Sequence, residues 1–229
     1  MFAENVKYVR ERIEEARERG GRSDDVTLLA VSKTFPESMI EEAYTAGHRE
    51  FGENRIQEAV AKADYFRDYE GLRLHFIGHL QTNKVRYLKD NFALIHSLDR
   101  LSLLKEMQKH FAKEGRVQDV LVQVNVAEDP DKSGVSIDGL IELLDKTAAA
   151  ENLNLCGLTM MPPLVDDHEK NRVHFAKTRE LYDKYKDSYG LSILSMGMSG
   201  DYEIAVEEGS TLVRVGTALF GKRDYSKVK

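Results

Sequence analysis

Lys33 is the residue whose type and position most directly indicate chemistry. It ends an apolar run over residues 27–33, and Pro36 follows it at a position that suits the first turn of a helix. A continuous apolar run is typical of a parallel strand buried on both faces, and ligands bind at the carboxyl ends of such strands. A lysine at a strand end can also only reach solvent, so a functional role for Lys33 depends on the rest of the chain.

Two glycine-rich turns near the C-terminus indicate a phosphate site. The first is the stretch 197–201, Gly-Met-Ser-Gly-Asp, in which Asp201 is placed to cap a short helix, and the second is Gly216-Thr217. Backbone N–H groups at helix starts, joined by Ser and Thr hydroxyls, can hold a phosphate group. Glycine turns also occur only to make corners, but two neighbouring turns after the last two strands of a barrel favour phosphate binding.

Arg214 lies two residues before Gly216, so both residues share one face of the last predicted strand. An arginine inside a barrel is costly unless its charge is paired. The pattern leaves two interpretations open, a structural ion pair with a neighbour such as Glu53 or a donor to a bound ligand.

A lysine amine, a phosphate cradle and an arginine together fit pyridoxal 5′-phosphate (PLP). This cofactor needs an amine for its aldehyde, an anion site for its phosphate and a partner for its ring nitrogen. A zinc site is not favoured, because His75, His79 and His96 lack a convincing helical pair and no cysteine supports them.

The elements that must position these residues alternate along the chain. A charged amphipathic helix over residues 2–19 comes first and ends at Gly20-Gly21. Apolar runs predict strands near 27–33, 50–54, 73–78, 92–98, 119–126, 154–161, 192–197 and 211–216. Helical stretches between them are predicted at 37–46, 54–66, 101–113, 137–150 and 169–186. Eight such units favour an α/β fold, a single (β/α)₈ TIM barrel with an extra N-terminal helix, and a doubly wound sheet is the competing architecture.

Composition excludes several classes of protein. The chain has 229 residues, 41% of them hydrophobic and 31% charged, which is ordinary for a globular domain. A net charge of −6 gives no general attraction to nucleic acid or to an anionic membrane. One cysteine, Cys156, cannot form an internal disulfide, and neither a signal peptide nor an apolar run of membrane-spanning length is present. We therefore expect a cytoplasmic protein.

The chain resembles the YggS/PROSC family of pyridoxal-phosphate homeostasis proteins over nearly its whole length. The stretch 74–84, Leu-His-Phe-Ile-Gly-His-Leu-Gln-Thr-Asn-Lys, looks like the signature of that family. Further family-like blocks occur in family order at 30–34, 51–54, 132–134, 157–162, 195–201 and 214–217. One departure is Leu74, where the family usually has an aromatic residue, and it puts little in doubt.

The resemblance implies a barrel similar to the N-terminal domain of alanine racemase, with PLP as cofactor. It implies a Schiff base at Lys33 and a role for Asn54 near the ring hydroxyl and for Arg214 at the pyridine nitrogen. The phosphate is then held around Ser199, Gly200, Gly216 and Thr217. We expect one PLP-binding domain over 1–229, with the helix at 1–20 and the barrel at 27–221.

The resemblance also implies a function without catalysis. The family is regarded as non-enzymatic, holding or delivering PLP in vitamin B6 homeostasis, so we expect a monomer whose partners are PLP and PLP-dependent apo-enzymes, with no catalytic residue and no metal. The alternative is an amino-acid racemase of the alanine racemase type. Racemisation needs a second acid or base besides the lysine, and we expect the additional domain that supplies it to be absent. A phosphosugar-binding barrel enzyme would explain the phosphate loops but not Lys33.

Overall fold

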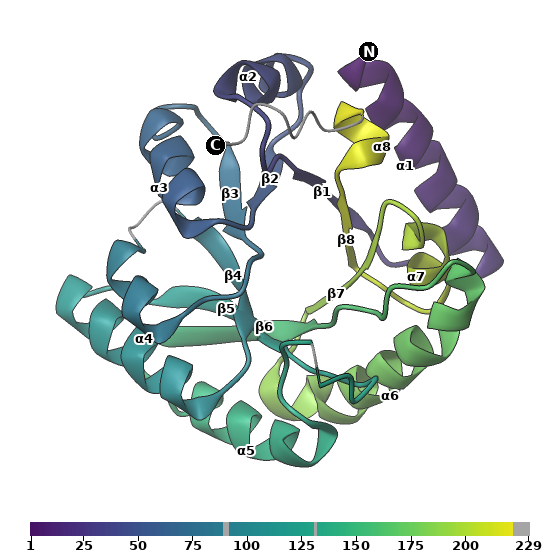
Figure 1. Cartoon of the computed structure of the whole chain (residues 1–229). Helices are drawn as coiled ribbons and strands as arrows, with labels where there is room; N and C mark the ends of the chain where they lie inside the picture. The colour runs from purple at the N-terminus through teal and green to yellow at the C-terminus, as the bar shows by residue number, and fades with distance from the viewer. Residues whose placement is uncertain (89–91, 131, 222–229) are drawn as a thin grey trace.

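Eight parallel strands pair in chain order and the last pairs with the first, which closes a barrel (Figure 1). The computed structural model describes residues 1–88, 92–130 and 132–221. The strands are β1 (Thr27–Val31), β2 (Glu50–Glu53), β3 (Arg73–Phe76), β4 (Phe92–Leu98), β5 (Gln118–Gln123), β6 (Leu153–Thr159), β7 (Ile193–Met198) and β8 (Leu212–Val215). The pairing of Thr27 with Leu212 and of Ala30 with Val215 excludes a doubly wound sheet, because such a sheet has open edges. The predicted barrel is confirmed.

Helices surround the barrel at close to the predicted positions. They are α1 (Phe2–Arg19), α2 (Glu37–Thr45), α3 (Ile56–Tyr65), η1 (Thr82–Tyr87), α4 (Leu101–Glu114), α5 (Ile137–Ala148), η2 (His168–Asn171), α6 (Arg172–Tyr189), α7 (Tyr202–Glu207) and α8 (Thr217–Phe220). The main difference is at residues 168–171, where the short 3₁₀ helix η2 precedes α6. The predicted single domain extends over residues 222–229, which lie outside the described residues.

The core explains why the apolar runs are continuous. In β1 the residues from Leu28 to Val31 are all buried, because one face of the strand lines the barrel interior and the other packs against helices. In α4 the buried residues Leu103, Met107 and Phe111 recur every four residues and form the face turned to the sheet. The continuous burial of β1 is the pattern that the sequence predicts.

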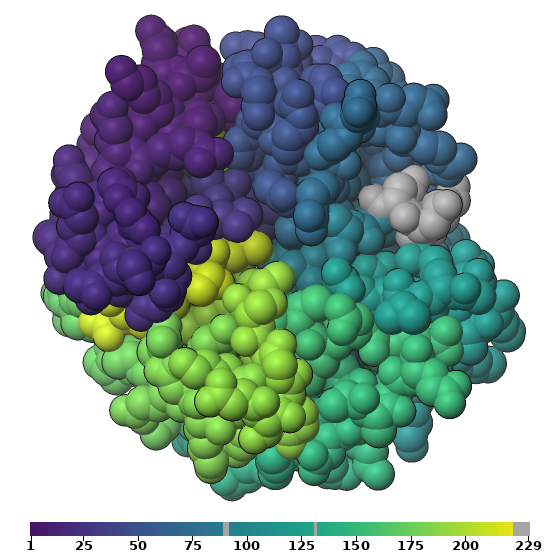
Figure 2. Space-filling model, turned by 180° about the vertical axis from the view of Figure 1, so that it is seen from behind, coloured from purple at the N-terminus to yellow at the C-terminus, as the bar shows by residue number. Residues whose placement is uncertain are grey.

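The N-terminal helix α1 covers the side of the barrel where the first and last strands meet. It packs against α7 and α8, and the Asn5 side chain donates to the carbonyl of Leu219 at 2.8 Å. Arg12 and Arg19 both form ion pairs with Glu203. Figure 2 shows α1, in purple, beside the region of β8 and α8, in yellow. The extra helix therefore belongs to the barrel unit. Among the described residues, no helix has the length and apolar character needed to cross a membrane.

Candidate functional site

A cavity of about 700 Å³ opens at the carboxyl end of the barrel. Its lining comes from the segments that follow β1, β2, β3, β5, β6, β7 and β8. All the predicted binding residues line it: Lys33, Asn54, Ser199, Gly200, Arg214, Gly216 and Thr217. The fold therefore brings together residues that are up to 184 positions apart, from Lys33 to Thr217.

Lys33 lies in a turn beyond β1, since the strand ends at Val31 and not at residue 33 as predicted. The backbone is held on both sides of Lys33. The Lys62 ammonium donates to the carbonyl of Ser32 at 2.9 Å, and the Thr34 N–H donates to Glu58 Oε1 at 2.7 Å. Thr34 has a φ of 69°, a conformation that is unfavourable for a β-branched residue and must be held by its surroundings.

The groups that hold this turn form a buried ionic cluster of Lys62, Glu53, Glu58 and Ser32. Lys62 Nζ lies 2.7 Å from Glu53 Oε1 and 2.8 Å from Glu58 Oε1, and the Ser32 hydroxyl donates to Glu53 at 2.6 Å. Glu53 is fully buried, and burial raises its pKa to about 7 although Lys62 acts in the opposite direction. Two carboxylates share one ammonium, which is consistent with a carboxyl group that holds its proton more tightly.

The hydrogen bonds of Glu53 decide between the two interpretations that the sequence left open for Arg214. Glu53 bonds to Lys62 and Ser32, so the suggested ion pair between Glu53 and Arg214 does not form. Sequence reasoning did not identify Lys62 at all. The sequence feature that could have identified Lys62 is its position on the apolar face of α3, one turn after Glu58 and between the buried residues Ala59 and Ala63.

Arg214 is buried in the barrel and reaches the floor of the cavity. Its guanidinium donates to Ser195 Oγ at 2.6 Å, to Thr159 Oγ1 at 3.1 Å and to the Met160 carbonyl at 2.8 Å. These described partners are all neutral. Burial lowers the pKa of Arg214 to about 10, which still leaves the group charged at neutral pH. A positive charge is therefore presented to the cavity.

The two glycine turns, which follow β7 and β8, meet at the edge of the cavity. The Gly216 N–H donates to Ser199 Oγ at 3.1 Å, which joins the turn after β7 to the turn after β8. Gly197 has a φ of +90°, and a Cβ atom at Gly200 would come within 2.5 Å of the His168 imidazole. Glycine is therefore required at position 197, and a side chain at position 200 would displace His168.

The predicted helix cap at Asp201 is wrong in its details. Asp201 does precede α7, but its side chain does not cap that helix. One oxygen accepts the Met198 N–H at 2.7 Å and the other accepts from Asn171 Nδ2 at 3.1 Å. Asp201 therefore closes the turn of 197–201 on itself and ties it to the segment before α6.

Asn54 lies beside the cavity with a buried polar atom that lacks a partner. Its Oδ1 has no hydrogen bond among the described residues. The segment after β3 covers the Asn54 backbone closely, because a Cβ atom at Gly78 would lie 1.9 Å from the Asn54 carbonyl oxygen. An unsatisfied amide next to a cavity is suited to a ligand that carries a hydroxyl group.

Further polar residues line the cavity and were not among the predicted binding residues. Ser133 and His79 lie 3.0 Å apart, Oγ to Nδ1, and Lys132 and His168 also reach the cavity. His79 and Lys132 do lie within the family-like blocks, which was the available signal. Among the residues that the structure covers, no group of three or more His, Cys, Asp or Glu side chains could hold a metal ion.

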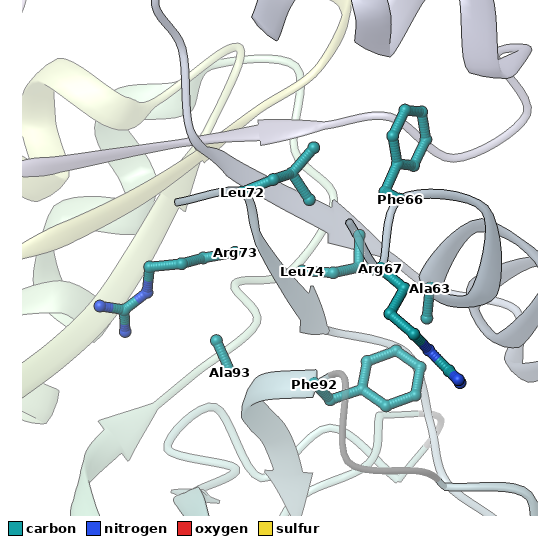
Figure 3. A pocket seen from close by; sticks show the side chains of 8 residues that line it. All are labelled: Ala63, Phe66, Arg67, Leu72, Arg73, Leu74, Phe92 and Ala93. Atoms are coloured by element: carbon teal, nitrogen blue, oxygen red, sulfur yellow. The ribbon is translucent and has the colours of Figure 1, made fainter. Parts of the chain in front are cut away.

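A second hollow of about 310 Å³ lies at the opposite, amino end of the barrel (Figure 3). It contains none of the predicted binding residues. Its lining comes from the end of α3 and the beginnings of β3 and β4: Ala63, Phe66, Arg67, Leu72, Arg73, Leu74, Phe92 and Ala93. The candidate site is therefore the cavity at the carboxyl end.

Sequence comparisons cover nearly the whole chain and agree with one another. Residues 5–224 match the family described as alanine racemase, N-terminal domain. A pyridoxal phosphate homeostasis protein of Aquifex aeolicus is 46% identical over 225 residues, which cover 97% of this chain and 98% of that protein. The protein of the same name from Escherichia coli K12 is 41% identical over 230 residues, which cover 99% of this chain and 98% of that protein.

Comparison with solved structures gives the same result. PipY of Synechococcus elongatus, a COG0325 family member solved with PLP bound, has a TM-score of 0.84 at 35% identity and covers 96% of this chain and 100% of its own. Alanine racemase of Corynebacterium glutamicum, at 15% identity and a TM-score of 0.66, shares the fold. This chain spans 62% of that racemase.

Proposed function

Because the chain belongs to the alanine racemase N-terminal domain family, we propose that it binds PLP at the carboxyl end of its barrel and acts in PLP homeostasis. Its relatives at 46% and 41% identity carry that function in their names, and their matches cover 97% and 99% of this chain. The observation that carries the proposal is the convergence of a lysine, an arginine and two glycine turns on one cavity.

The residues of the cavity fit the cofactor. When bound, PLP supplies an aldehyde that reacts with amines and an electron-withdrawing ring. Lys33 is the amine at which we propose covalent attachment, and Asn54 Oδ1 is a buried acceptor that still needs a donor such as the ring hydroxyl. Arg214 faces the ring nitrogen in this arrangement and disfavours its protonation, because two adjacent positive charges repel.

The phosphate group is assigned to the two glycine turns. Ser199 and Thr217 contribute hydroxyl groups and Gly200 contributes a backbone N–H group, while Gly216 lets the backbone approach the phosphate without a side chain in the way. The hydrogen bond from Gly216 to Ser199 keeps these donors together.

We further propose that the protein holds PLP without useful turnover of amino acids. The full-length match is to proteins named for homeostasis, whereas the match to a racemase covers 62% of that enzyme. Racemisation requires an acid or base on each face of the substrate carbanion, and Lys33 supplies only one.

A titration with PLP tests the proposal. Purified protein should bind one equivalent of PLP with a change in visible absorption, and borohydride should make that change irreversible. With alanine present, the α-hydrogen should exchange with solvent deuterium far more slowly than ordinary enzyme rates of roughly 1–1,000 per second. Absence of saturable binding would refute the function, and exchange at enzyme rates would favour a racemase.

A further inference from the structure

A line of polar side chains crosses the interior of the barrel, where branched apolar residues usually lie. Burying polar groups costs free energy unless each one is hydrogen-bonded. The line begins at Glu50 on β2 and continues through His75 on β3, His96 on β4 and Ser195 on β7 to Arg214 on β8. We call Glu50, His75, His96 and Ser195 the interior relay.

The hydrogen bonds of the interior relay are continuous from one end of the barrel to the cavity. Glu50 Oε2 lies 2.7 Å from His75 Nε2, and His75 Nδ1 lies 3.0 Å from His96 Nε2. His96 Nδ1 lies 3.4 Å from Ser195 Oγ, which accepts from Arg214 at 2.6 Å. Only Glu50 is partly exposed, with 24% of its side chain accessible, whereas His75 and His96 are each 2% exposed.

One arrangement of protons satisfies every member when both imidazoles are neutral. A carboxylate only accepts, so His75 carries its proton on Nε2 and offers Nδ1 as an acceptor. His96 must then donate from Nε2 and accept at Nδ1. The remaining donor for His96 Nδ1 is the Ser195 hydroxyl, whose oxygen is left to accept from Arg214. In this arrangement each group, starting from Arg214, donates its hydrogen bond to the next group in the direction of Glu50.

Complete burial supports the neutral state of His96. Desolvation, together with His75 and Arg214 nearby, holds the pKa of His96 well below its usual value. Glu50 keeps its charge, since its pKa lies below the usual value owing to His75 and Arg73, which outweigh its partial burial. In this arrangement His75, His96 and Ser195 separate the negative end of the interior relay from Arg214.

We propose that the interior relay positions Arg214 toward the bound cofactor through neutral contacts, with no carboxylate among the described residues hydrogen-bonded to its guanidinium, and that His96 is the positioning residue. A carboxylate in direct contact would orient the guanidinium equally well but would neutralise the charge that faces the ring nitrogen. A serine hydroxyl that donates a hydrogen bond to His96 fixes the geometry with neutral groups. The proposal rests on PLP binding at this cavity.

Nuclear magnetic resonance of the cofactor-free protein with ¹⁵N-labelled histidine tests the proton arrangement directly. At neutral pH, His75 and His96 should both be neutral with the proton on Nε2. The ¹⁵N signal of Nε2 in each ring should then show one-bond coupling to a proton, and that of Nδ1 should not. A proton on His96 Nδ1, or an imidazolium at His96, would overturn the relay. This result does not depend on whether PLP binds.

Substitutions at position 96 test the effect on the cofactor site. His96→Gln can still accept from Ser195 and donate to His75, whereas His96→Leu can do neither. We expect PLP affinity to fall roughly two- to tenfold in His96→Leu and in Ser195→Ala, with a shifted absorption maximum of bound PLP, and to recover largely in His96→Gln. His110→Leu is the matched control, because His110 lies on α4, outside the barrel, and its described hydrogen bond is to the Leu88 carbonyl.

The outcomes separate the positioning role of the interior relay from the proposed binding of PLP. Equal spectra and affinities for the Leu and Gln variants, or a change no larger than that of His110→Leu, would refute the positioning role. If neither the parent protein nor any variant binds PLP, the proposed function fails, while the labelled-histidine spectra still show whether the relay exists.

Discussion

The Lys62 ammonium donates to the carbonyl oxygen of Ser32 across 2.9 Å and so anchors the residue that precedes Lys33. On the other side, Glu58 accepts the backbone N–H of Thr34. Both contacts come from α3, a helix that follows the next strand along the chain. The turn that presents Lys33 to the cavity is therefore held by a buried ionic cluster that never touches the cavity itself.

Lys62→Met should destabilise the protein strongly. The change leaves Glu53 buried without its cation, and breaking a buried pair from one side costs about 3–5 kcal/mol. The free energy of unfolding is measured by urea denaturation. Lys177→Met is the matched control, since Lys177 pairs with Glu180 on the surface and 48% of its side chain is exposed. That control should change stability by about 0.5 kcal/mol or less. Equal effects of the two substitutions would show that the buried cluster contributes little.

The raised pKa of Glu53 predicts a pH dependence with a definite sign. In the folded protein the pKa is about 7, above the ordinary value of 4.5, so the folded state binds more protons than the unfolded state between these values. Stability contributed by this group must then fall as pH rises from about 4.5 to about 7. Glu53→Gln removes the titration but keeps the shape of the side chain. The stability of the parent relative to this variant should be greater at pH 5 than at pH 8, by on the order of 2 kcal/mol.

Urea denaturation of both proteins at both pH values gives this difference, and titrations of groups far from Glu53 cancel in the comparison. A difference that is constant with pH, or that grows toward pH 8, would show that Glu53 titrates normally.

The barrel and much of the cavity could be predicted because their signals are local. The run 27–33 and the seven other strand-like runs reflect burial on two faces, and the turns at 197–201 and 216–217 follow directly from their glycines. The contacts of Lys62 could not be predicted, because they depend on how α3 packs against the ends of β1 and β2. His96 and Ser195 are 99 residues apart and meet only once the barrel closes. Polar pairs of this kind leave no periodic pattern.

Reductive trapping should place PLP on Lys33. Lys132 also lines the cavity, and Lys84 lines a neighbouring hollow that shares Asn54 and His79 with it, so these two lysines are the natural alternatives. After addition of PLP and borohydride, peptide mapping should find the label on Lys33 and no stable label in Lys33→Ala. We expect Lys33→Ala to retain weaker, dialysable binding of PLP through the phosphate site. Labelling of Lys84 or Lys132 in the parent protein would contradict the assignment.

Replacing Ser199 and Thr217 together by Ala separates the phosphate site from the covalent link. Hydrogen bonds to a charged phosphate contribute about 1.5–3 kcal/mol each, so loss of two hydroxyl groups should weaken PLP binding at least tenfold. Ser199 Oγ also accepts the Gly216 N–H at 3.1 Å, and without it the two turns lose their direct connection. Lys33 should nevertheless still react with PLP at high concentration, because its own turn is held by the cluster around Lys62.

Pyridoxal, which lacks the phosphate, should bind weakly and equally to the parent and to the double variant. Equilibrium titrations of both proteins with both ligands give the four affinities. If the double variant lost affinity for pyridoxal as much as for PLP, Ser199 and Thr217 would support the shape of the cavity without holding the phosphate.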